Sequence, residues 1–154
     1  MAVLLLLTAC HEVREPVSSI DIADAMTANQ LLFGFYQLEN DAWRWTAREF
    51  SVAVKPPAGA EQRGATLRLD LFIPDSQIEL LGPMTMAATT GRYALESETF
   101  SKGGSYSYTR KIPPEALATS LLPVDFCFDK ALAPLSADGR ELAVIVSKIE
   151  LQME

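Results

Sequence analysis

The chain has 154 residues, of which 49% are hydrophobic and 21% charged, and its mean hydropathy of +0.11 is typical of one folded globular domain. These values exclude a disordered or collagen-like protein, and a chain of about 150 residues buries enough surface to fold without disulfides or a structural metal. Thirteen Lys and Arg against twenty Asp and Glu give a formal charge of −7, so we expect no nucleic-acid partner, because phosphate backbones attract basic proteins.

The first ten residues, MAVLLLLTAC, form an apolar run that ends at the polar His11. The run is far shorter than the ~20 apolar residues of a membrane-spanning helix and is typical of a signal segment. Its end, Leu7-Thr8-Ala9-Cys10, resembles the lipobox of bacterial lipoproteins, in which the Cys becomes the lipid-bearing first residue. The resemblance implies a signal-like segment over residues 1–9, a membrane anchor on Cys10, and a place in the bacterial cell envelope, on its periplasmic or extracellular face.

Two alternatives to this interpretation of the N-terminus stay open. No Lys or Arg precedes the apolar run, unlike in most signal peptides, and a short apolar run also fits a strand buried against the domain. The second Cys of the chain, Cys127, is able to pair with Cys10 in an oxidising compartment, and spacing does not decide between a disulfide and lipidation.

Residues 10–30 are predicted to be a tether with one or two helical turns, and residues 31–154 the domain proper. Alternating apolar and polar residues between Pro, Gly and Asp turns predict strands over 50–55, 65–73, 84–90, from 93 onward, 106–112, 124–130 and 141–151. The clearest alternation directs Leu67, Leu69, Leu71 and Ile73 to one face and Arg68, Asp70 and Phe72 to the other. The strand 124–130 likewise directs Val124, Phe126 and Phe128 inward.

About seven to eight such strands, with turn signals between them and no stretch of helical periodicity, predict an all-β fold. We expect a single antiparallel β-sandwich, jelly-roll or immunoglobulin-like, behind a short N-terminal tether. The absence of helical crossover segments argues against a parallel α/β sheet.

Both tryptophans of the chain lie in the segment 33–50, and in an extended strand Trp43 and Trp45 share one face. The pair is typical of a flat platform for the apolar face of a sugar, with hydrogen-bonding groups beside it on Gln37, Glu39 and Arg44. The alternative is that both rings lie in the core between two sheets, with Arg44 paired to Glu39 or Glu49.

Short motifs near both ends of the domain resemble an uncharacterised bacterial β-sandwich domain found in envelope lipoproteins and attached to enzymes of surface-polysaccharide synthesis. The motifs are Gly34-Phe35-Tyr36, then Glu39, then Trp43-Arg44-Trp45-Thr46, and finally Asp138-Gly139-Arg140-Glu141-Leu142. The resemblance implies the sandwich fold and a non-catalytic, carbohydrate-associated role, with signature positions at Tyr36, Glu39, Arg44, Trp45, Asp138 and Arg140. In one structural interpretation, Asp138 caps a turn while Arg140 or Arg44 pairs with Glu39 and so joins the first and last strands.

The sequence offers no enzyme constellation. His11 is the only imidazole and lies in the tether, so the domain holds no Ser-His-Asp or Cys-His arrangement, and the ligands of an ordinary zinc site are missing. Cys127 lies between Asp125 and Asp129, whose charges raise the pKa of the thiol and make it a poor nucleophile. We expect no catalytic residue, metal or cofactor.

Tyr106 and Tyr108 follow a Gly-Gly turn and either contact a ligand or fill a strand face. The sequence thus predicts a membrane-anchored lipoprotein whose sandwich binds envelope carbohydrate or an envelope protein. Its candidate contact residues are Tyr36, Glu39, Trp43, Arg44, Trp45, Tyr106 and Tyr108. The alternative function is an accessory structural subunit that docks on the outer face of a larger membrane complex.

Overall fold

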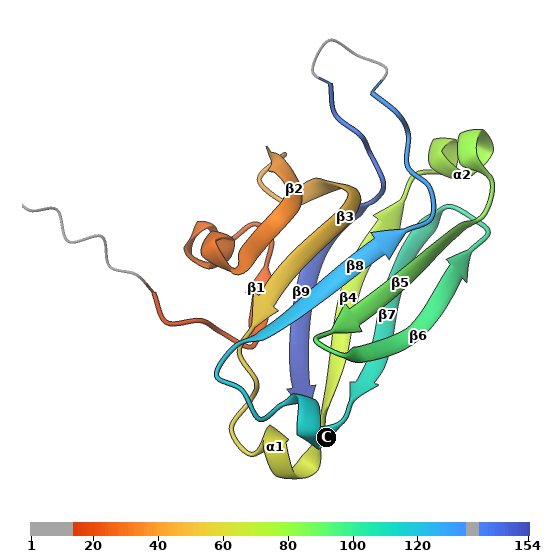
Figure 1. Ribbon diagram of the computed structural model, residues 1–154. Helices are drawn as coiled ribbons and strands as arrows, with labels where there is room; N and C mark the ends of the chain where they lie inside the picture. The colour runs from red at the N-terminus through yellow and green to blue at the C-terminus, as the bar shows by residue number, and fades with distance from the viewer. Residues whose placement is uncertain (1–13, 135–138) are drawn as a thin grey trace, which may run out of the picture.

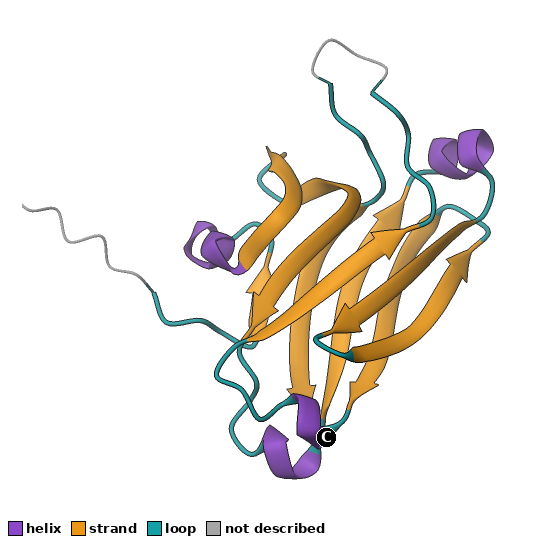
Figure 2. Ribbon diagram, viewed as in Figure 1, coloured by secondary structure: helices purple, strands orange, loops and turns teal. Residues whose placement is uncertain are grey.

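The computed structural model describes residues 14–134 and 139–154, so Cys10 and Asp138 lie outside the described residues. Strands make up most of the described chain (Figure 2): β1 (Ser19–Asp21), β2 (Leu31–Glu39), β3 (Trp43–Val54), β4 (Ala65–Ile73), β5 (Met84–Thr90), β6 (Tyr93–Phe100), β7 (Gly104–Ile112), β8 (Leu122–Phe128) and β9 (Ile145–Met153). Two short α-helices and two 3₁₀ helices connect them: α1 (Ala60–Arg63), α2 (Asp75–Leu81), η1 (Ala25–Gln30) and η2 (Pro114–Ala116).

The strands form a two-layered antiparallel β-sandwich, as the sequence predicts. The sheet order is β6-β5-β8-β3-β9-β4-β7. Two further strands pair with members of this series, β2 with β3 and β1 with β9. Figure 1 shows β5, β6 and β8 crossing in front of β4, β7 and β9. The expected alternation is confirmed in both layers, because Leu67, Leu69 and Ile73 of the rear layer and Val124 and Phe128 of the front layer are each completely buried.

Strand β3 belongs to both layers. Its first residues, Arg44 and Trp45, pair with β9 in the rear layer, and its last six, Glu49 to Val54, pair with β8 in the front layer. Strand β2 follows this bent strand with several register shifts. At Gly34 it comes so close to β3 that an added Cβ would stand 2.1 Å from the carbonyl oxygen of Glu49. Only glycine fits there.

The two outer strands β6 and β7 meet through side chains. The Tyr108 hydroxyl and the Arg110 Nε each donate to the carbonyl oxygen of Glu96, at 2.8 Å, and the guanidinium of Arg110 lies 4.2 Å from the Tyr108 ring centroid. Tyr108 itself is completely buried. The prediction that Tyr108 contacts a ligand is therefore corrected: its ring fills the core and its hydroxyl helps to close the sandwich.

The structure departs from the predicted elements in several places. Strand β2 and the first seven residues of β3, from Trp43 to Glu49, were not among the predicted strands, and the short helix α1 was not predicted. Residues 19–30 lie on the domain instead of forming a tether, since β1 pairs with β9 and Ile20 is fully buried. The helix α2 was not predicted. Its buried Gln77 donates to the carbonyl oxygens of Leu142 and Ala143, at 2.9 and 2.6 Å, and the last strand begins only at Ile145 instead of at residue 141.

Gly34→Ala is expected to destabilise the domain severely. The backbone φ of Gly34 is +80° and the new methyl group has no room, so we expect a loss of about 3 kcal/mol or more in the free energy of unfolding. Gly91→Ala is the matched control, because Gly91 also has a positive φ, +56°, but nothing within 4 Å, and its loss should be about 1 kcal/mol. Chemical denaturation of both variants measures the difference. Equal losses would contradict the close contact.

Candidate functional site

The hairpin of β2 and β3 brings five of the predicted contact residues together: Tyr36, Glu39, Trp43, Arg44 and Trp45. The hairpin closes at Asn40 and Asp41, which both adopt positive φ, and Glu39 pairs directly with Trp43. Tyr106 lies elsewhere, on β7, where its hydroxyl donates to the carbonyl oxygen of Lys102 at 2.7 Å and its ring packs on Phe100. These contacts give Tyr106 a structural role, and it is also one of the residues that line the pocket described below.

An ion pair joins this hairpin to the segment that leads into β9. The Arg140 guanidinium donates to the Glu39 carboxylate at 2.8 Å and lies 5.6 Å from the ring centroid of Tyr36. Of the two pairings considered for Glu39, the one with Arg140 is confirmed, because Arg44 donates instead to the carbonyl oxygen of Tyr36 at 2.9 Å. Three of the signature residues, Tyr36, Glu39 and Arg140, therefore join the two ends of the domain.

The two tryptophans do not belong to the core between the layers. Both are half-buried, and neither is part of the buried cluster that holds Phe50 and Phe126. Trp45 pairs with Ile145 of β9, and Trp43, two residues earlier on β3, shares its face. The core interpretation is therefore wrong, and the rings lie on the outer face of the rear layer. The Trp43 Nε1 is buried without a hydrogen-bond partner among the described residues, so this N–H is not exposed to a ligand at the surface.

The register of the rear layer continues the line that starts at Trp45. Ile145 pairs with Trp45 on one side and with Phe72 of β4 on the other, and Phe72 pairs with Ser105 of β7. Because directly paired residues of adjacent strands project to the same face, these four side chains form a row across four strands. Phe72 is 42% exposed, and together with Ile145 and Trp45 it makes the row apolar over three strands. We call this row, together with the polar side chains of Asp70, Ser107 and Ser147 beside it, the aromatic face.

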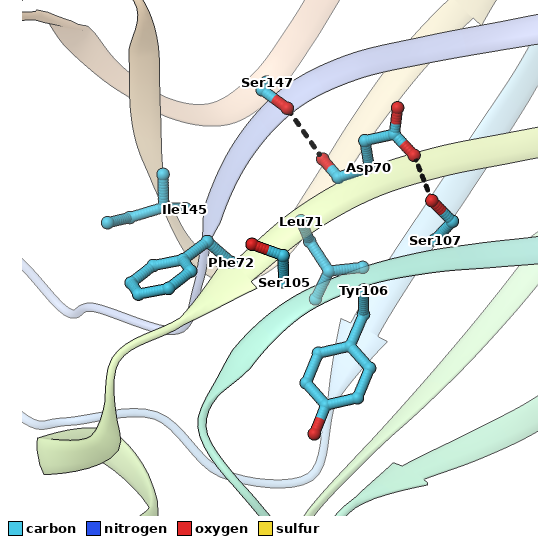
Figure 3. A pocket seen from close by; sticks show the side chains of 8 residues that line it. All are labelled: Asp70, Leu71, Phe72, Ser105, Tyr106, Ser107, Ile145 and Ser147. Atoms are coloured by element: carbon cyan, nitrogen blue, oxygen red, sulfur yellow. Dashed lines mark hydrogen bonds between the residues drawn. The ribbon is translucent and has the colours of Figure 1, made fainter.

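A shallow pocket of about 220 Å³ lies on the aromatic face (Figure 3). Phe72 and Ile145 lie together on one side of it, and polar groups line the other. The Ser107 hydroxyl donates to the Asp70 carboxylate at 2.5 Å, and the Ser147 hydroxyl lies 3.5 Å from the Asp70 carbonyl oxygen. The pocket thus combines an apolar side with a row of hydroxyl and carboxylate groups.

The Asp70 carboxylate is held in its ionised form. Partial burial raises its pKa, but hydrogen bonds from Arg68, whose Nε lies 2.8 Å away, and from Ser107 outweigh this effect, so that the pKa lies below the usual value. At neutral pH Asp70 is therefore a hydrogen-bond acceptor and not a proton donor.

Two other hollows carry weaker evidence for a ligand. One of about 330 Å³ lies on the front layer between Phe33, Glu49, Asp125 and Cys127, and has a single exposed ring. Partial burial and the charge of Glu49 raise the pKa of Cys127, which agrees with the prediction of a poor nucleophile. The other, of about 490 Å³, lies along the β6–β7 seam, where the guanidinium of Arg110 is already occupied in closing the sandwich.

The sequence does not predict the part of the site that lies outside residues 33–50. It directed Asp70 and Phe72 to the solvent side of their strand without assigning them a role. An aromatic residue at an otherwise polar alternating position is the signal that was available for Phe72. Nothing local indicates Ile145 or Ser147, because they join the site only through the pairing of β9 with β3 and β4.

Comparisons with known proteins bear on the fold alone. No family model matches the chain, and a search of curated proteins finds no match. Among solved structures, a carbohydrate-binding module, TmCBM27, described as specific for mannan, is 13% identical, with a TM-score of 0.51 over 90% of this chain and 97% of that one. A CBM4 structure is 10% identical, covers 80% of this chain and 77% of that chain, and has a TM-score of 0.38, too low to carry an argument.

In the described part of the chain, no helix has the length and apolarity needed to cross a bilayer, and no group of three or more metal-ligating side chains gathers.

The stability contributed by Asp70 should depend on pH. Because its pKa is lower in the folded chain than the ordinary 3.8, its ionised form stabilises the fold above that value, and this stabilisation is lost as the pH falls through the folded pKa. Thermal unfolding should show the wild type melting above Asp70→Asn at pH values above about 5, with a difference that shrinks in more acidic solution. A difference that is constant with pH would contradict the assignment.

Proposed function

We propose that this chain is a non-catalytic, membrane-anchored lipoprotein whose aromatic face binds envelope carbohydrate. The observation that carries the proposal is the row of Trp45, Ile145 and Phe72 beside the polar groups of Asp70 and Ser107. Sugars present apolar C–H faces and hydroxyl edges, so a site for them needs flat apolar side chains next to hydrogen-bonding groups. The pocket brings Phe72 and Ile145 together with Asp70 and Ser107, and Trp45 continues the apolar row beyond the residues that line it.

The likeness to a carbohydrate-binding module supports the class of ligand. It spans nearly the whole chain, and a sandwich of this architecture serves as a mannan-recognising module in that protein. The sequence identity of 13% carries over no binding residue, so the aromatic face is argued from this chain alone.

The carboxylate of the pocket supports binding instead of hydrolysis. Glycoside hydrolysis ordinarily uses two carboxyl groups, one of them protonated at the start of the reaction. Asp70 is the only carboxyl group among the residues that line the described pocket, and its pKa is lowered. The lowered pKa suits a fixed hydrogen-bond acceptor.

The proposed anchor would hold the domain near the membrane. The chain is fixed to the sandwich from Val17 onward, since the carbonyl oxygens of Val17 and Ser18 accept from the backbone N–H groups of Lys55 and Leu151, at 3.1 and 2.8 Å. Seven residues from Cys10 to Val17 reach at most about 25 Å when extended. A lipid on Cys10 would therefore hold the domain close to the membrane, with the aromatic row at Ile145 six residues along β9 from the attachment point at Leu151.

Phe72→Ala and Trp45→Ala are each expected to weaken glycan binding without unfolding the domain. Losing one stacked ring should cost roughly 1 to 2 kcal/mol of binding free energy, about a tenfold rise in Kd. Phe33→Ala is the matched control, because this ring is 53% exposed but lies on the other layer. Titration calorimetry with envelope polysaccharide, with circular dichroism as the folding check, measures the effect.

Loss of binding only in Phe33→Ala would place the ligand on the front layer. Folded variants of Phe72 and Trp45 that bind as well as the wild type would contradict the proposed site.

Cys10→Ala is expected to release the chain from the membrane. Lipidation supplies the proposed anchor, so the variant should move from the membrane to the soluble fraction of native cells, and the acylated mass of the wild type should be absent. Cys127→Ala is the control and should stay with the membrane. Membrane association of Cys10→Ala would contradict the lipoprotein assignment.

One observation favours the second function, docking on a larger membrane complex. Of the six large hydrophobic side chains exposed in the described chain, three lie close together in the sequence, at Met26, Leu32 and Phe33. An apolar segment of this kind suits a protein interface. Co-purification of a stoichiometric partner that Phe33→Ala abolishes would favour docking over glycan binding.

A further inference from the structure

We infer that the aromatic face takes an extended, uncharged glycan chain that lies across the strands. This inference rests on the proposed carbohydrate binding and adds to it the direction, the length and the charge class of the ligand. It follows from the register of four strands and from the ion pairs around Asp70.

The direction follows from where the apolar side chains lie. Trp45, Ile145 and Phe72 are consecutive partners across β3, β9 and β4, so apolar surface continues from strand to strand. Along β4 it does not continue, because the next outward residues after Phe72 are Asp70 and then Arg68. A chain that stacks its C–H faces on this surface must therefore run across the strands.

The length follows from the spacing of strands in a sheet. Adjacent strands lie about 4.8 Å apart, so the backbones at Trp45 and Phe72 are separated by roughly 10 Å. One pyranose ring does not span this distance, whereas two linked rings do. Ser105, one strand further, extends the row to about 14 Å, enough for a third ring.

A second row of residues is placed to bind the hydroxyl edge of the same chain. Asp70 and Ser107 are direct partners two residues along from Phe72 and Ser105, or about 7 Å away. Ser147 belongs to β9, and its hydroxyl lies beside Asp70 of β4 (Figure 3). The serine hydroxyls of this row both donate and accept hydrogen bonds, as each sugar hydroxyl does. The row is therefore suited to an uncharged ligand.

The two cations beside the aromatic row are each paired with a carboxylate. Arg68 pairs with Asp70 and Lys148 with Glu150, both at 2.8 Å, and Lys148 also lowers the pKa of Asp70 through its charge. These four groups sum to zero, and Asp21, which stands opposite Lys148 across β1 and β9, adds one negative charge. An anionic glycan therefore finds no net positive charge on this face, which favours an uncharged chain over an anionic one.

The test is titration calorimetry of the full chain with neutral β-1,4-linked manno- and gluco-oligosaccharides of one to six units. Oligogalacturonate serves as the anionic probe, oligochitosan as the cationic one, and malto-oligosaccharide, whose α-linkage coils the chain, as the non-extended control. We expect Kd to fall at least tenfold from one to three units, to level off after four, and to change less than twofold between 50 and 500 mM salt. The charged and coiled probes should bind at least tenfold more weakly.

Variants test the direction. Trp45→Ala and Phe72→Ala should each remove most of the gain in affinity between one and three sugar units. If the glycan instead lay along β4, Arg68→Gln and Phe72→Ala would weaken binding and Trp45→Ala would not. Two outcomes would overturn this inference and leave carbohydrate binding standing. One is a monosaccharide that binds as tightly as the hexasaccharide, and the other is a charged probe that binds more tightly than the neutral chains and in a salt-sensitive way. Failure of every saccharide to bind would overturn the proposed function itself.

Discussion

The candidate site depends on one constraint, the pairing of β9 along both of its edges. Ile145 stands opposite Trp45 on one side and opposite Phe72 on the other, although these two partners are 27 positions apart in the sequence. A shift of either pairing by one residue would turn the ring concerned to the opposite face of the sheet. The aromatic row exists only in this register.

Contacts elsewhere in the fold hold that register. Strand β3 reaches β9 only with its first residues, since its remainder pairs with β8 in the front layer. The amide of Gln77 binds the two carbonyl groups just before β9, and the Arg140–Glu39 pair ties the same segment to the hairpin. Gly34 allows β2 to lie directly on the bent β3. The signature residues Glu39 and Arg140 thus help to position the aromatic face, whereas the signature residue Trp45 forms part of it.

The sequence predicts the local part of this architecture well and the long-range part poorly. The bounds of β4 and β5 and the inward residues of β8 follow from alternation, because one face of each strand packs in the core. The late start of β9 and the helix α2 do not, since both depend on a tertiary contact of Gln77. In the site, the tryptophan pair and the Arg140–Glu39 pairing were predicted. Phe72 gained its partners only from strand order, which no local pattern contains.

The most direct test of the central claim is a backbone-amide NMR titration of the isotopically labelled chain with a neutral oligosaccharide. We expect chemical-shift changes on three strands, at Trp45, Ile145 and Phe72, that extend to Ser107, while the front layer around Phe33 and Cys127 stays unchanged. Changes centred on that front layer, or no changes at saturating saccharide, would contradict the assignment of the aromatic face as the binding surface.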